Sequence, residues 1–219
     1  MIMNTNEISG KRQMEFLAGF DYIREAGTAG EEKAAALIQE TLSSFGVESR
    51  LEEFSFDTFQ IKKAKLTITE PYTKEYTVTG YGRCANTAED GLKAPFVYAE
   101  NGDDISLAQV KGKIVMVNDP VRKDMYQKLV KAGAVGFISI AGSPLDEGVD
   151  LIPRAYGLPK NLPGEEKKAA GKEAQNYDNR IPGVSIHYKD AIELVTKGAS
   201  QACLVVEQET VTRTSRNVV

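Results

Sequence analysis

The feature that most constrains the fold of this chain is a strand–helix–strand pattern in its middle third. Residues 111–119, KGKIVMVND, are a short apolar run bounded by turn residues, which is typical of a buried strand. Residues 122–134 follow with apolar side chains at helical spacing, and residues 135–142, VGFISIAG, repeat the buried-strand pattern. A helix of this length between two strands is a crossover connection, so the pattern predicts a parallel pair.

Strand patterns also flank this unit on both sides. Residues 47–60, 63–71 and 75–82 alternate between apolar and polar side chains and have short connections, which predicts an antiparallel meander. After the meander we expect a strand at 94–101, a strand followed by a helix at 181–198, and one or two strands at 201–219. The mixture predicts an α/β (α+β) fold.

Two helices are expected before the first strand. Residues 6–26 place Met14, Leu17 and Phe20 on one stripe, and Gly27 can end this helix in a left-handed turn. The second helix is expected within residues 27–46, where residues at both ends indicate its limits.

Thr28 and Glu31 have the spacing of a capping box, in which each side chain accepts the backbone N–H of the other residue. Gly46 is suited to the left-handed residue that follows a helix. An apolar stripe lies between these ends and consists of Ala34, Ile38, Leu42 and Phe45. Because burying a large side chain contributes about 1.5–3 kcal/mol, we expect this helix to pack against another part of the molecule.

Residues 143–180 lose all periodicity. They contain four prolines, several glycines and many charges. A stretch of this length without a pattern usually indicates a functional or mobile loop.

Composition argues against several classes of function. The net charge is −4 and no basic block is present, so nothing indicates nucleic-acid binding. The apolar runs are shorter than the about 20 residues that a membrane-spanning helix needs. The first residues lack the apolar segment of a signal peptide, so we expect a cytoplasmic protein, or a secreted one if a leader was removed. Cys84 and Cys203 are expected to be reduced thiols.

The single histidine, His187, limits the chemistry most. A zinc site needs three or four converging His, Cys, Asp or Glu ligands, and the acid nearest to His187 in sequence, Asp190, lies beyond the expected strand. We interpret His187 as an ordinary partly buried histidine, and a role as ligand or catalytic base is the alternative. The sequence has neither a nucleophile elbow nor a P-loop. From the residues we predict no catalytic, cofactor-binding or metal-binding residue in this chain.

Four elements of the chain also occur together in one known family. They are a GKIV strand, a helix ending in Ala-Gly-Ala, a strand beginning with glycine and, after a variable loop, an Ile-Pro-x-Val-x-Ile strand with a short helix. The corresponding residues are 112–118, 128–134, 136–140 and 181–186, and the likeness covers about residues 80–205. In this combination the chain resembles the protease-associated (PA) domain, which implies a β-rich sandwich or open barrel with short helices.

The flanking segments carry a second resemblance. GTAGEEKAAALIQETLSSFG at 27–46 and SRNVV at 215–219 are similar to the N-terminal helix and the re-entry strand of zinc aminopeptidases of metallopeptidase family 28, the aminopeptidase Y and glutamate carboxypeptidase-like group. The resemblance implies a peptidase-type segment at 1–60, an inserted PA domain at 61–207 and a re-entry strand at 208–219. It also implies that strand 48–56 pairs with part of 208–219.

The zinc ligands of that family have no counterpart in this sequence. The resemblance implies the N-terminal and PA portion of a zinc aminopeptidase, which shapes substrate access and is inactive by itself. Zinc and the peptide substrate would belong to a longer parent, whose peptidase domain would be the main partner of this chain. The alternatives are a free-standing PA-type module that binds a peptide or a protein, and a fragment of an inactive peptidase homologue.

Two further expectations concern contacts. Arg154 and Tyr156 in the aperiodic loop are expected to contact the peptide substrate, with an exposed loop that binds nothing as the alternative. The C-terminal edge strand is expected to support self-association, because an unpaired strand edge can pair with another chain.

Overall fold

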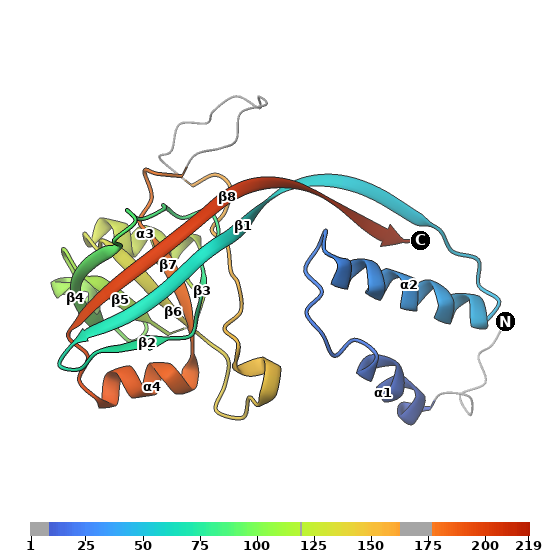
Figure 1. Ribbon diagram of the computed structural model, residues 1–219, viewed down its shortest axis with the longest axis horizontal. Coiled ribbons are helices and arrows are strands. Elements are labelled where there is room, and N and C mark those ends of the chain that lie inside the picture. Colours follow the sequence, from blue (N-terminus) through green and yellow to red (C-terminus); the bar gives the residue numbers. More distant parts are fainter. Residues whose placement is uncertain (1–8, 119, 163–176) are drawn as a thin grey trace. The chain divides into compact units, whose positions relative to one another are not determined.

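The computed structural model describes residues 9–118, 120–162 and 177–219. The chain divides into two compact units: unit 1 contains Met1–Thr58 and Thr212–Val219, and unit 2 contains Phe59–Val211. Two long strands, β1 (Leu51–Glu70) and β8 (Gln201–Val218), contribute residues to both units (Figure 1). The expected domain borders at 60 and 207 stay a prediction.

Four neighbouring strands form the centre of unit 2. They are β4 (Leu92–Tyr98), β5 (Ile114–Val117), β6 (Gly136–Ala141) and β7 (Gly183–His187), and each is parallel to the next. The helix α3 (Lys123–Lys131) connects β5 to β6, so the predicted crossover and its parallel pair are confirmed. All residues of β5 and β7 are buried, which explains the continuous apolar run of β5.

The two ends of the sheet are joined by a single residue. Among the described residues the strands form one eight-stranded sheet with the order β2-β1-β8-β4-β5-β6-β7-β3. β2 (Lys74–Tyr76) and β3 (Val78–Gly80) lie at opposite ends of this order, although only Thr77 separates them in sequence. The sheet must therefore curl until its ends approach each other, as in an open barrel. The mixed sheet and its helices confirm the predicted α/β (α+β) fold class.

The predicted meander is only partly present. Residues 47–60 and 63–71 contribute to one strand, β1, because no glycine or proline interrupts the sequence from Leu51 to Glu70. β1 pairs with β2 in an antiparallel hairpin, whereas β3 pairs with β7. The prediction of three consecutive paired strands is therefore wrong, because the chain leaves the hairpin at Thr77 to reach the opposite end of the sheet.

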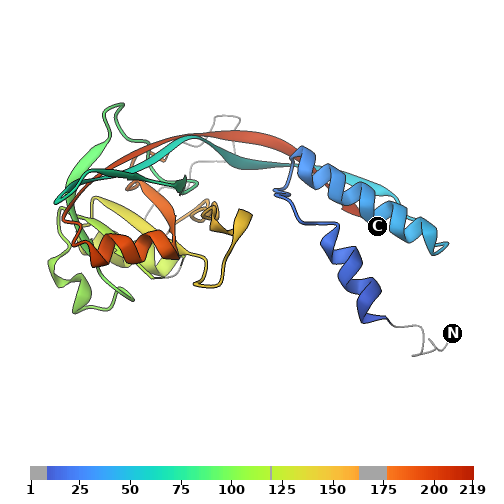
Figure 2. The same cartoon turned by 60° about the horizontal axis from the view of Figure 1, so that its bottom comes forward.

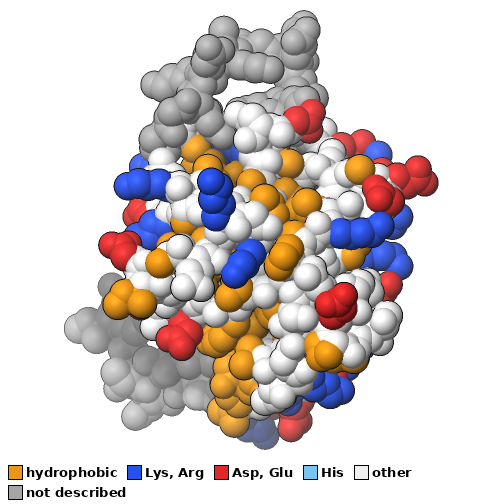
Figure 3. Space-filling view, turned by 90° about the vertical axis from the view of Figure 1, so that its left-hand side faces the viewer, with side chains coloured by type: hydrophobic (Ala, Val, Ile, Leu, Met, Phe, Trp, Pro, Cys, Tyr) orange, Lys and Arg blue, Asp and Glu red, His pale blue; other side chains and the backbone are white. Residues whose placement is uncertain are grey.

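The hydrophobic core of the described residues lies in unit 2. Two helices pack on the sheet and bury apolar side chains: Tyr126 and Leu129 from α3, and Ala191 and Leu194 from α4 (Tyr188–Thr196). On the face of unit 2 that lies at the left of Figure 1, apolar side chains are interspersed with both positive and negative ones (Figure 3).

Unit 1 begins with a helix that is shorter than predicted. α1 spans Gly10–Ala18, and the chain turns at Gly19 instead of continuing to residue 26. Residues 6–8 of the predicted helix lie outside the described residues. Gly27 therefore does not end α1 but lies, at a φ of 72°, in the turn before the next helix. The low helix propensity of Gly19, the residue that follows Ala18, favours the end of the helix at this point.

The second helix, α2, spans Ala29–Ser44, and Gly46 follows it with a φ of 71°, as predicted. The prediction of a capping box between Thr28 and Glu31, however, is wrong. The Thr28 hydroxyl donates to the carbonyl of Glu25 at 2.7 Å, and the Glu31 carboxylate accepts the N–H of Gly27 at 3.1 Å. The two predicted partners are therefore engaged one turn upstream and not with each other.

The two chain segments of unit 1 pair through a ribbon of two strands, β1 and β8. Arg50 N–H donates to the carbonyl of Val219 at 2.7 Å, and Val219 N–H donates back at 2.9 Å. Farther along the ribbon, the Thr212 hydroxyl bonds to Asp57 at 3.1 Å. The predicted pairing of strand 48–56 with residues from 208–219 is thus confirmed, and α2 lies beside this end of β8 (Figure 2).

Candidate functional site

The aperiodic loop contains the two residues expected to contact a substrate. Arg154 is exposed. Tyr156 is half-buried, and its ring stacks on Tyr81 with 5.8 Å between the ring centroids. The carbonyl of Tyr156 accepts the N–H of Gly82 at 2.7 Å. Arg154 is therefore free to meet a ligand, whereas Tyr156 also has a packing role; substrate contact by either residue stays a prediction.

The start of the same loop is held by a clamp that sequence reasoning missed. The Asp146 carboxylate accepts both the N–H and the hydroxyl of Ser143, at 2.8 and 2.6 Å, and it bonds to His187 Nε2 at 3.2 Å. The Lys189 side chain donates to the carbonyl of Asp146 at 2.7 Å. His187 and Asp146 are 41 residues apart, so no sequence spacing pointed to the pair.

The proton of His187 is fixed by its neighbours. Its Nδ1 accepts the N–H of Lys189 at 3.1 Å, so Nε2 carries the hydrogen that it donates to Asp146. Both ring nitrogens are thus engaged, and the hydroxyl of Ser185, the nearest serine in sequence, is not among their partners. A serine–histidine relay requires the hydroxyl to bond to a ring nitrogen, so the geometry supports a structural clamp. His187 is buried, more completely than the partial burial that the sequence predicted.

Hydrogen bonding to the ionised form shifts the pKa of Asp146. The Ser143 hydroxyl and N–H, followed by His187, lower the pKa of this carboxyl to about 2. Asp146 is therefore ionised at neutral pH and acts as a permanent acceptor for the clamp.

The two cysteines are free thiols, as the composition predicts. Burial raises the pKa of Cys84 to about 12, and burial also raises the pKa of Cys203. The Cys84 thiol donates to the carbonyl of Tyr81 and accepts the N–H of Gly183 at 3.3 Å. Because the thiolate is the nucleophilic form, neither residue has the environment of a catalytic cysteine.

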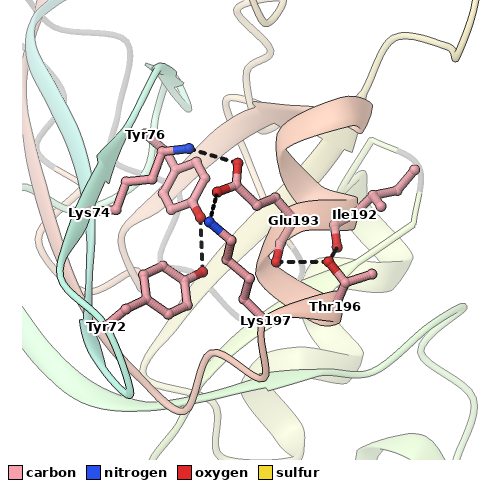
Figure 4. Close-up of polar contacts among 7 residues, drawn as sticks. All are labelled: Tyr72, Lys74, Tyr76, Ile192, Glu193, Thr196 and Lys197. Atoms are coloured by element: carbon pink, nitrogen blue, oxygen red, sulfur yellow. Dashed lines mark hydrogen bonds and ion pairs between the residues drawn. The ribbon is translucent and has the colours of Figure 1, made fainter.

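A polar cluster fastens the β1–β2 hairpin to α4 (Figure 4). The Glu193 carboxylate binds Lys197 Nζ at 2.6 Å and Lys74 Nζ at 2.7 Å, while the hydroxyls of Tyr72 and Tyr76 share a bond of 2.8 Å. Lys197 and then Lys74 lower the pKa of Glu193 to about 2, and burial raises the pKa of Tyr76. Lys74 and Glu193 are far apart in sequence, so only the fold reveals the cluster, whose contacts indicate a structural role.

Unit 1 contains a groove of about 550 Å³ between α1 and α2. Its lining combines polar residues with apolar ones: Ser9, Arg12, Gln13, Thr41, Phe16, Ile38, Leu42 and Phe45. Among the described residues of this unit, the only buried apolar side chains are Ala34 and Ala35. The sequence predicted the apolar stripe of α2, but it gave no sign that the stripe would stay partly uncovered.

Neither a metal-binding cluster nor a membrane-spanning helix is found in the part of the chain that the structure describes. Within residues 9–118, 120–162 and 177–219, no three His, Cys, Asp or Glu side chains are grouped so that they could hold a metal ion. No helix in this part of the chain combines the length and the apolar character needed to cross a membrane.

Comparison with known proteins identifies the fold. The model of the PA domain family matches residues 74–194. A zinc aminopeptidase from Bacillus subtilis has 22% identity and a TM-score of 0.62, and the match covers 94% of this chain and 44% of that one. A peptidase M28 precursor from Shewanella amazonensis has 18% identity and a TM-score of 0.60, with coverage of 94% and 48%.

A third structure, an aminopeptidase from Aneurinibacillus sp. strain AM-1, has 20% identity, a TM-score of 0.50 and coverage of 93% and 45%. At these identities the likeness shows a shared fold. The chain spans less than half the length of these structures. No curated protein matched the chain.

Proposed function

The chain belongs to the PA domain family, and from this premise we propose that it is the N-terminal and PA-domain portion of a zinc-dependent aminopeptidase. In this proposal unit 2 borders the active-site cleft and influences which peptides enter it. Hydrolysis and the zinc ions belong to a peptidase domain that completes unit 1. The 219-residue chain alone is inactive.

The observation that carries the proposal is the lack of a core among the described residues of unit 1. Its helices and strands have apolar side chains, yet Phe45 is 69% exposed and Leu51, Phe54 and Met14 are also exposed. A domain of this size cannot compensate the entropy of folding without burying such surface. The apolar residues of unit 1 therefore need a partner, and we assign them to a peptidase domain.

The solved structures support the identity of this partner. They match nearly the whole of this chain, and more than half of each lies outside the match. The two named as aminopeptidases act on peptides, and one of these is a zinc enzyme. A polypeptide of similar length, joined to unit 1, would supply both the missing core and the metal ligands.

Amide hydrogen exchange on the 219-residue chain tests the proposal. We expect strong protection in β5, β6 and β7 and weak protection throughout α1 and α2, because exchange reports local stability. Protection of α2 equal to that of β6 would show that unit 1 is complete without a partner. Calorimetry with zinc should detect no stoichiometric binding, and chelator-sensitive peptide cleavage by the pure chain would overturn the proposal.

A second candidate function is a free-standing PA-type module that binds a peptide or a protein. The observation that favours it is the core of unit 2, whose described members all belong to that unit. The coding sequence after Val219 distinguishes the candidates. Continuation into a segment with His-x-Asp zinc ligands supports the peptidase, a peptidase-like segment without such ligands supports an inactive homologue, and a stop codon supports the module.

A further inference from the structure

The segment from Leu145 to Ile152, here called the 145–152 tip, presents apolar side chains to solvent. Leu145 is 88% exposed, Leu151 40% and Ile152 50%. A short 3₁₀ helix, η3 (Gly148–Leu151), shapes the segment, which stands out from the sheet of unit 2 (Figures 1 and 2). Exposing several apolar side chains on one short loop is unfavourable unless they meet a partner.

The base of the tip is held on both sides. The clamp formed by Ser143, Asp146 and His187 fixes its first residues. At the other end, Pro153 is buried and its carbonyl accepts the Thr79 hydroxyl at 2.7 Å. A loop anchored in this way loses little conformational entropy on binding, so its apolar side chains can contribute more to affinity.

The tip also has a defined charge. Glu147 and Asp150 are exposed, and residues 144–153 contain no lysine or arginine. Neither acid forms an ion pair with another described residue. Lys189 donates to the carbonyl of Asp146 and keeps its positive charge at the base of the tip, and Arg154 follows the tip in sequence. The acids Asp146, Glu147 and Asp150 outnumber these two cations, so the tip favours a partner that is apolar and positively charged.

We propose that the 145–152 tip is a binding surface for a polypeptide segment in which apolar side chains lie next to lysine or arginine. The apolar side chains of the segment would contact Leu145, Leu151 and Ile152, and its cations would face Glu147 and Asp150. This inference rests on the tip itself and holds whether or not the chain belongs to a peptidase.

Titration of the isotopically labelled full chain with short peptides tests the proposal. The probes are three end-capped peptides that contain Lys-Leu-Phe-Lys, Glu-Leu-Phe-Glu or Lys-Ser-Ser-Lys. We expect the first peptide to shift the amide resonances of the tip and to bind at least tenfold more tightly than the other two. Added salt should weaken its binding, because the charges involved are exposed.

Matched variants complete the test. Leu145→Ser combined with Ile152→Ser should weaken binding of the first peptide at least tenfold, and Glu147→Gln with Asp150→Asn should abolish its preference over the glutamate peptide. Ile105→Ser is the control, because Ile105 is also 88% exposed but lies outside the tip. Unchanged core resonances verify the fold of each variant. The proposal would be overturned if the lysine and glutamate peptides bound with equal affinity, or if only amide resonances outside the tip shifted. It would also be overturned if the control variant lost as much affinity as the tip variants.

Discussion

The carboxylate of Glu31 on α2 accepts the backbone N–H of Arg216 on β8 at 3.1 Å. The same carboxylate accepts the Ser215 hydroxyl at 3.0 Å and the N–H of Gly27 at 3.1 Å. Burial raises the pKa of Glu31, but these hydrogen bonds outweigh it and hold the pKa below its ordinary value. Glu31 therefore joins the start of α2 to β8. It also occupies the backbone N–H of Arg216, which an additional strand would need for pairing with β8.

Glu31→Gln should loosen this junction. We expect the Arg216 amide to exchange about five to ten times faster, because one hydrogen bond contributes about 1 kcal/mol. Glu32→Gln is the matched control, since the Glu32 carboxylate pairs with the side chain of Arg216, whereas Glu31 binds its backbone N–H. Equal acceleration in both variants would show that general charge, and not the bond from Glu31, protects the amide.

The same junction should respond to acid. The folded-state pKa of Glu31 is lowered from 4.5, so its contribution to stability is complete above about pH 4.5 and is lost as the pH falls through the folded value. Exchange of the Arg216 amide, corrected for its intrinsic rate, should therefore increase on acidification in the natural chain. Glu31→Gln should show a smaller change over this range.

Self-association through the C-terminal edge strand should depend on Glu31. Part of the β8 edge is occupied by this carboxylate, so we expect weak association of the natural chain at high concentration and stronger association of Glu31→Ala. Light scattering over a concentration series measures both. Strictly monomeric behaviour of the natural chain and the variant would contradict the prediction.

The Asp146 clamp should control the susceptibility of the 145–152 tip to proteases. Asp146→Asn removes the charged acceptor of Ser143 and His187, so cleavage between Leu145 and Leu151 should become several times faster. Asp150→Asn, which leaves the clamp intact, is the control. The pKa of Asp146 is about 2 in the folded chain against 3.8 ordinarily, so the natural clamp should hold above pH 3.8 and open as the pH falls toward 2.

Gly183→Ala should destabilise unit 2. The Phe137 ring on β6 lies over Gly183 on β7, and a Cβ at that position would collide with it. Overpacking in a buried sheet costs about 1–3 kcal/mol, which chemical denaturation followed by circular dichroism can measure. Gly10→Ala is the control, because its added Cβ meets no atom within 4 Å. Equal stability of the two variants would contradict this account of the sheet.

Arg154 and Tyr156 should influence substrate binding in a complete peptidase. We expect Arg154→Ala to raise KM several-fold with little change in kcat, because an exposed cation outside the chemical step affects binding alone. Tyr156→Phe separates the hydroxyl from the ring, which also packs on Tyr81. Unchanged kinetics in both variants would remove these residues from the substrate site.

Local patterns were sufficient for much of the fold. Nearly all residues of β5, β6 and β7 are buried and most are apolar, so their strand character and the crossover through α3 could be predicted from a window of a few residues. The glycine after α2 could also be predicted, because a left-handed residue at that position is a local requirement. By contrast, the length of β1 and the partner of β3 depended on pairing with distant strands.

The sequence by itself determined the fold class and the approximate positions of the buried strands, because these follow from the spacing of apolar side chains along the chain. Its motifs also carried the resemblance to the PA domain family. Only the tertiary structure decided that Glu31 binds β8, that His187 binds Asp146 and that β2 and β3 lie at opposite ends of one curled sheet. The first two relationships join residues far apart in sequence, and the third places two strands that are adjacent in sequence at opposite ends of the sheet. Their geometry is set by the packing of the whole chain, and a short stretch of sequence does not contain it.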